Sequence, residues 1–157
     1  MNIEYDKQLM MKEIKELAIK FRFAIDSARN ERRFSADQCF RNFPTGCCGI
    51  TAELLARFLM DNGIKGKVTY IGGTYHDYSL ELQSHAWLII ENDIVVDITG
   101  DQFKYYPVPV NFNETVYVGL YNDFYNLFEI NKEDTCNNDY PLDDTCLLYT
   151  SPSPRDT

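Results

Sequence analysis

The sequence lacks a long hydrophobic run, and this absence excludes a large class of proteins. No apolar stretch approaches the roughly 18 residues that a membrane-spanning helix needs. The first residues, Met1–Asp6, are acidic, whereas a signal peptide begins with basic residues and continues with an apolar segment. We therefore expect a cytoplasmic protein with no membrane contact; an export signal lost upstream of Met1 is the alternative.

Positive charge is also scarce. The 157 residues include 15 Lys and Arg against 24 Asp and Glu, so the formal net charge is −9, and the basic residues form no dense run. Proteins that bind nucleic acid or an anionic membrane usually present a basic patch. We therefore expect the partner to be a small molecule, a peptide or a protein. The length suffices for one domain around a single core.

Cysteine is present but is too irregularly spaced for a structural framework. The five cysteines are Cys39, Cys47, Cys48, Cys136 and Cys146. An odd, uneven set favours free thiols in a reducing compartment over disulfides. The adjacent pair lacks the two-residue spacer that allows two sulfurs to converge on one tetrahedral zinc ion. We expect neither a metal nor an organic cofactor.

What the sequence does contain is a pattern of two helices followed by strands. Apolar residues between about Tyr5 and Arg29 recur at alternating spacings of three and four, which is typical of an amphipathic helix. After a polar and aromatic connector over 34–45, a second helix is predicted from Cys48 to Asn62, with Gly63 as its C-terminal cap.

The remainder is predicted to be mostly strands. A strand over 67–71 ends at Gly72-Gly73 and is followed by a polar loop over 74–83. The apolar segments 84–90 and 94–99 form a hairpin whose strands are covered on both faces. Further expected segments are an edge strand or extended loop over 104–110, a strand over 116–120, a short helix or strand over 122–130, and then a frayed tail.

The start of the second helix is where a thiol can become a nucleophile. Phe43-Pro44-Thr45-Gly46 places Cys47 and Cys48 on its first turn. The free N–H groups at a helix N-terminus stabilise a thiolate and can lower a cysteine pKa from about 8.5 to roughly 3.5–7.5. The alternative is that both cysteines are small apolar residues packed under the helix cap.

Two polar residues interrupt the apolar hairpin, His85 and Asp97. If Glu91-Asn92-Asp93 is a three-residue loop, Trp87 opposes Asp97, and His85 and Asp97 become diagonal neighbours on one face, with Cα atoms about 7–8 Å apart. A two-residue loop would place them on opposite faces. A cysteine, a histidine and an acid supply the nucleophile, the base and the group that orients the base in thiol catalysis.

At these residues the sequence resembles the transglutaminase-like, papain-like superfamily of cysteine enzymes, including small bacterial members. The matching pieces are Gly46-Cys47-Cys48-Gly49-Ile50-Thr51-Ala52, a helix ending in Gly63-Ile64, His85-Ala86-Trp87, Val96-Asp97-Ile98-Thr99, and the extension to Phe103. The resemblance implies Cys48, not Cys47, as nucleophile, with His85 and Asp97 completing a triad. It departs from the family at Ile98, where proline is common.

The resemblance also implies a fold and a reaction. The expected fold is α+β, transglutaminase-like, with the Cys48 helix packed on an antiparallel sheet that carries His85 and Asp97. The expected function is thiol-dependent acyl transfer or amide hydrolysis through a thioester, of peptidase, amidase or glutamine deamidase type. The alternative is a catalytically silent module of the same fold that binds a peptide or protein. Asn42 is the candidate side chain for the oxyanion, although an Asn before Phe43-Pro44 also suits a turn.

Residues 146–156 resemble the translated sequence of a transposase adapter used to prepare sequencing libraries. We expect one domain over 1–135, an acidic tail over 136–145, and an adapter-derived segment over 146–157 that carries no weight in the argument.

Overall fold

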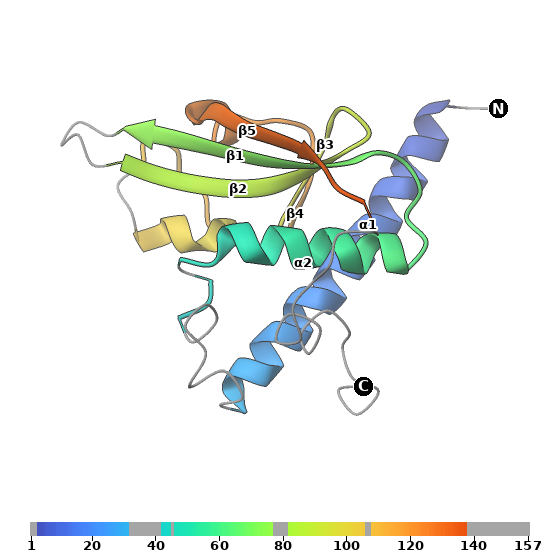
Figure 1. Ribbon diagram of the computed structural model, residues 1–157, viewed down its shortest axis with the longest axis horizontal. Coiled ribbons are helices and arrows are strands. Elements are labelled where there is room, and N and C mark those ends of the chain that lie inside the picture. Colours follow the sequence, from blue (N-terminus) through green and yellow to red (C-terminus); the bar gives the residue numbers. More distant parts are fainter. Residues whose placement is uncertain (1–2, 32–41, 45, 77–81, 106–107, 138–157) are drawn as a thin grey trace.

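The computed structural model describes residues 3–31, 42–44, 46–76, 82–105 and 108–137. Two helices pack on a five-stranded antiparallel sheet, which confirms the predicted α+β class (Figure 1). In chain order the elements are α1 (Ile3–Asn30), α2 (Cys48–Asp61), β1 (Val68–His76), β2 (Leu82–Ile90), β3 (Ile94–Asp97), the 3-10 helix η1 (Gly100–Tyr105), β4 (Tyr117–Gly119), the 3-10 helix η2 (Tyr125–Leu127) and β5 (Glu129–Thr135).

Both predicted helices are present, with ends within two residues of those expected. The buried side of α1 carries Ile14, Ala18, Phe21, Ile25 and Ala28, at the predicted alternation of three and four. The predicted cap of α2 is also found. Gly63 has a φ of +90°, and the N–H groups of Gly63 and Ile64 donate back to the carbonyls of Met60 and Leu59.

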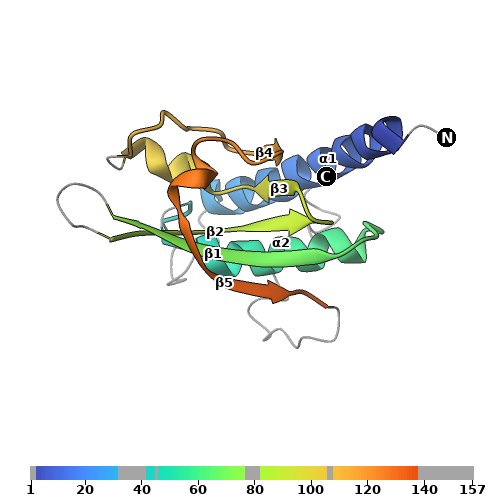
Figure 2. The ribbon, with the colours of Figure 1, turned by 90° about the horizontal axis from the view of Figure 1, so that it is seen from above.

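The sheet order is β4-β3-β2-β1-β5, so the β2–β3 hairpin lies near its centre. Ile90 pairs with Ile94 and Leu88 with Val96, which is the register expected for a three-residue turn. Seen from above, α2 lies behind β1 and β2, and α1 runs along β3 and β4 (Figure 2). The hairpin therefore occupies the interior, as its apolar sequence indicated.

The two faces of the sheet have different coverings. Leu88, Ile90 and Val96 belong to an aliphatic core shared with the helices. Trp87, Ile89 and Val95 alternate with them and belong to a second core, rich in aromatic rings from the segments after β3 and β4. This aromatic core surrounds His85.

Strand β1 is longer than predicted. It was expected to end at Gly72-Gly73, but it continues to His76. The two ends of the expected polar loop over 74–83 therefore belong to β1 and β2. Gly73 is needed for packing within the strand. A Cβ on Gly73 would lie 2.9 Å from the Cβ of Phe128, and the β1–β5 pairing changes register between the two glycines.

The first part of the expected frayed tail, after residue 130, is instead ordered. Glu129–Thr135 forms β5, an exposed strand paired with β1, and the N–H of Cys136 donates to the Val68 carbonyl at 2.8 Å. Its charged sequence, in which polar and apolar residues do not alternate, does not predict a strand. An edge strand can form without such a pattern, because backbone hydrogen bonds hold it in the sheet. The expected adapter-derived residues lie outside the described residues. Among the described helices, none is long and apolar enough to cross a membrane.

Candidate active site

The two adjacent cysteines lie in different environments. Cys47 precedes α2, is buried, and its thiol donates to the Pro44 carbonyl at 3.5 Å. Cys48 is the first residue of α2 and is only half-buried. The free N–H groups of the first helical turn favour negative charge at this end. The geometry therefore makes Cys48 the more accessible thiol, while its role as nucleophile stays a prediction.

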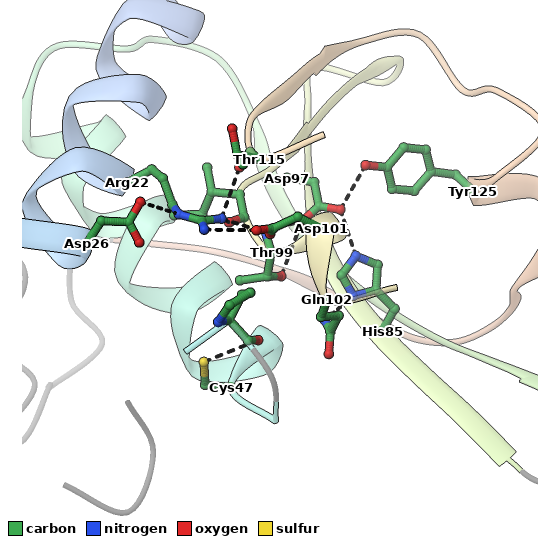
Figure 3. Close-up of polar contacts among 12 residues, drawn as sticks. Arg22, Asp26, Cys47, His85, Asp97, Thr99, Asp101, Gln102, Thr115 and Tyr125 are labelled. Atoms are coloured by element: carbon green, nitrogen blue, oxygen red, sulfur yellow. Dashed lines mark hydrogen bonds and ion pairs between the residues drawn. The ribbon is translucent and has the colours of Figure 1, made fainter. Parts of the chain in front are cut away.

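His85 is held inside the aromatic core. Its side chain is completely buried, and the centroid of its ring lies 4.9–5.9 Å from those of Phe103, Trp87, Phe128 and Phe124. Its Nε2 atom is 2.6 Å from Oδ2 of Asp97, the last residue of β3 (Figure 3). The diagonal contact expected from the hairpin register is therefore present.

Asp97 is buried with a full set of hydrogen-bond donors. Oδ1 accepts from the N–H and the hydroxyl of Thr99, at 2.9 and 3.3 Å. Oδ2 accepts from His85 and from the hydroxyl of Tyr125, which is 2.8 Å away. Although burial opposes ionisation, His85 and these donors lower the pKa of Asp97. The carboxylate is thus ionised despite its position in an apolar strand.

The ionised carboxylate determines which nitrogen of His85 carries the proton. A carboxylate only accepts hydrogen bonds, so Nε2 must be the donor to Asp97. This leaves Nδ1 to exchange a proton with a thiol. The nearby thiol is that of Cys48, because Cys48 and His85 each shift the pKa of the other.

The pKa shifts of this pair are in opposite directions. Burial disfavours both charged forms, but the Asp97 carboxylate and then Cys48 raise the pKa of His85 to about 9. Burial likewise opposes a Cys48 thiolate, yet His85, together with the Ala86 backbone, lowers the pKa of Cys48. The contacts therefore favour a thiolate beside an imidazolium ion.

Two residues that the sequence analysis did not select complete the surroundings of His85. Nε2 of Gln102, in η1, is 3.2 Å from Nδ1 of His85. Tyr125, in η2, is fully buried and donates to Asp97. Gln102 could have been found, because it lies in the Thr99–Phe103 extension that resembles the family. No sequence signal points to Tyr125, which is 28 residues from Asp97.

A buried arginine of the first helix contacts two segments of the site. The Arg22 guanidinium forms two hydrogen bonds with Asp101, at 2.8 and 2.9 Å, and one with the Ile98 carbonyl at 2.7 Å (Figure 3). It also lies 4.7 Å from the ring centre of Phe43, in the loop that precedes Cys48. One side chain of α1 thus contacts both the Asp97–Gln102 turn and the cysteine loop.

Asn42, the oxyanion candidate from the sequence, does not join this constellation. Asn42 is exposed, and within the described part of the chain no hydrogen bond connects it to Cys48, His85 or Asp97. His76 lies exposed at the end of β1. Tyr75 packs against Phe128.

The space beside Cys48 is narrow. The gap between Cys48, Ala86 and Asp97 is too small for a water molecule. A reacting group must therefore approach Cys48 from its exposed side. Within the described ranges, no three His, Cys, Asp or Glu side chains are grouped so that they could hold a metal ion.

The chain was compared with known proteins at three levels. Neither protein-family models, nor curated proteins, nor solved structures match it.

Proposed function

We propose that the chain is a cysteine hydrolase or acyltransferase with a transglutaminase-like fold, in which Cys48, His85 and Asp97 form the catalytic triad. The observation that carries the proposal is the His85–Asp97 hydrogen bond beside Cys48, whose pKa His85 lowers, at a helix N-terminus. The motif resemblance supports the same three residues independently. The helix-on-sheet arrangement and the hairpin register are compatible with this fold.

The proposed reaction has two steps. The Cys48 thiolate attacks an amide or ester carbonyl and forms the S–C bond, and His85 gives its Nδ1 proton to the departing amine or alcohol as the C–N or C–O bond of the substrate breaks. Water or an amine then loses a proton to His85, attacks the thioester and releases the Cys48 thiolate. Asp97 keeps the imidazole oriented and stabilises its positive charge throughout.

The oxyanion of this reaction needs donors near the thiol. We propose the backbone N–H of Cys48, at the start of α2, and the side-chain amide of Gln102. Gln102 fits this role better than Asn42, because its amide is buried within 3.2 Å of the catalytic face of His85. Protonation of Nδ1 removes the acceptor for the Gln102 N–H, which then becomes available to the substrate oxygen.

Selective alkylation tests the triad. Iodoacetamide at pH 6, followed by peptide mapping, should label Cys48 well before Cys47 and Cys136, because His85 lowers the pKa of Cys48, whereas Cys47 is buried and burial raises the pKa of Cys136. His85→Ala should abolish this preference. Equal, slow labelling of all three thiols would refute the proposal. His76→Ala is the matched control and should leave the preference intact.

A second candidate is a catalytically silent module that binds a peptide or protein. The narrow gap beside Cys48 and the complete burial of His85 favour it. Activated esters such as p-nitrophenyl acetate separate the two candidates. A stoichiometric acyl adduct on Cys48, detected by mass spectrometry and followed by its turnover, supports the enzyme; a stable adduct without turnover supports the silent module.

A further inference from the structure

A cavity lies beside α2, away from the gap at Cys48. Its volume is about 400 Å³, within the usual range for ligand sites. Glu53, Ala56 and Met60 of α2 form one wall, and Tyr70 of β1 with Lys132 and Cys136 forms the opposite wall. The triad does not use this cavity.

One residue of the cavity wall, Tyr70, also lies close to the start of α2. Gly49, Glu53, Ala56 and Met60 are spaced by four, three and four residues, so they line one face of α2. Gly49 follows Cys48 directly, and a Cβ placed on it would lie 3.1 Å from the Tyr70 hydroxyl. Tyr70 therefore connects the thiol end of the helix to the cavity.

The charges that line the cavity are unequally compensated. Arg57 forms an ion pair with Asp61, and the Lys132 ammonium lies near both the Tyr70 ring and Asp134. Glu53 has no ion pair with any residue that the structure describes. Burial, then the charges of Cys48 and Glu53, raise the pKa of Tyr70, so the Glu53 carboxylate acts on the cavity wall. Two cations and two carboxylates thus line the cavity, and Glu53 is the lining carboxylate that remains for a cationic ligand.

Distances along the helix relate the cavity to the reacting carbonyl. With a rise of about 1.5 Å per residue, the middle of the cavity wall near Ala56 lies about 12 Å from Cys48 along the axis. An extended peptide covers about 3.3 Å per residue, so this distance corresponds to about three or four residues.

We propose that this cavity is a subsite for a lysine or arginine side chain of a polypeptide substrate, located about three or four residues from the carbonyl that reacts at Cys48. This rests on the proposed function, because it places the reacting carbonyl at Cys48. It makes the substrate a basic polypeptide segment in preference to a free small amide. Glu53 binds the cationic group, and the α2 wall packs against its methylenes.

The test measures binding apart from chemistry. The protein carries Cys48→Ala, and the probe is a fluorescein-labelled, capped alanine peptide with a central glutamine and a lysine three residues away on each side. A matched peptide has norleucine in place of both lysines. Fluorescence anisotropy should give about fivefold tighter binding of the lysine peptide at low salt, and 0.5 M NaCl should reduce this ratio.

Glu53→Gln should bring the lysine to norleucine ratio close to one, whereas Glu16→Gln, on the exposed side of α1, should leave it unchanged. The lysine peptide should also slow alkylation of Cys136, which lines the cavity. Equal binding of the two peptides, or a ratio unaffected by Glu53→Gln, would overturn the subsite. Neither result depends on the reactivity of Cys48, so the triad and the subsite can fail separately.

Discussion

The Tyr125 hydroxyl lies 2.8 Å from the same Asp97 oxygen that binds the His85 ring. The hydrogen bond is buried, and burial and the charge of Asp97 raise the pKa of Tyr125 well above its usual value, so the hydroxyl stays protonated and donates. Tyr125 is therefore a positioning residue for the proposed triad, acting through Asp97.

Tyr125→Phe should show this role. Removing one donor to a buried carboxylate should lower the free energy of unfolding by about 1.5–3 kcal/mol, measured with urea. Asp97 should then attract the imidazolium more strongly, so the pKa of His85, followed by NMR of its ring, should rise further. Tyr121→Phe, which alters an exposed neighbouring hydroxyl, is the control. An unchanged His85 titration would contradict a role through Asp97.

The coupled pair predicts a specific dependence of stability on pH. The pKa of His85 is raised from 6.5 to about 9 on folding, so its stabilisation is present below pH 6.5 and is lost as the pH rises through about 9. The pKa of Cys48 is lowered from 9.0, so its stabilisation is present above that value and is lost as the pH falls through the folded value. Between pH 6.5 and 9, therefore, His85 makes the free energy of unfolding fall with pH, whereas Cys48 makes it rise.

Cys48→Ala should remove the rise of stability with pH that comes from Cys48 and leave the fall with pH that comes from His85. The fall should remain because Asp97 contributes more than Cys48 to the raised pKa of His85. Relative to wild type, the free energy of unfolding should therefore decline between pH 6.5 and 9, measured by urea titration at several pH values. Cys136→Ala should not change the slope in this way. Parallel curves for wild type and Cys48→Ala would show that the thiolate and imidazolium do not form a pair.

Gln102→Leu should separate two properties of the site. The Gln102 N–H can donate to Nδ1 only while Nδ1 is unprotonated, and at pH 6 the His85 ring is already an imidazolium ion, so the rate of alkylation of Cys48 should stay close to that of the wild type. Turnover of an activated ester should nevertheless fall about 10²-fold, because an oxyanion donor is lost. Gln8→Leu, on the surface of α1, should alter neither rate. A parallel fall in both rates would indicate a structural defect instead.

The ion pair between Arg22 and Asp101 should matter more for stability than exposed pairs do. Arg22→Met leaves Asp101 buried without its partner and should cost about 3–5 kcal/mol in urea unfolding. The double variant Arg22→Met/Asp101→Leu should recover part of this loss. Arg57→Met breaks an exposed pair and should cost less than about 1 kcal/mol. If Arg22→Met lowers the free energy of unfolding by less than about 1 kcal/mol, Arg22 does not stabilise the site.

Local patterns were sufficient for several features of this protein. The periodicity of apolar residues located α1 and α2, and Gly63 located the end of α2, because helices and their caps depend on contacts three to five residues apart. The odd loop length determined that His85 and Asp97 share a face, because side chains alternate along a strand. The motif resemblance distinguished Cys48 from Cys47.

Other features were decided by the tertiary structure, since they join residues far apart in the chain. In the sequence, Gly72 and Gly73 indicate the end of a strand, but in the structure the strand continues because β5 pairs with it there. The sequence of β5 shows no strand pattern, because backbone pairing with β1 holds it. Arg22 reaches Asp101 across 79 positions. The sequence thus determined which local elements carry Cys48, His85 and Asp97, while long-range packing decided which side chains orient them, because a hydrogen bond depends on distance in space and not on distance along the chain.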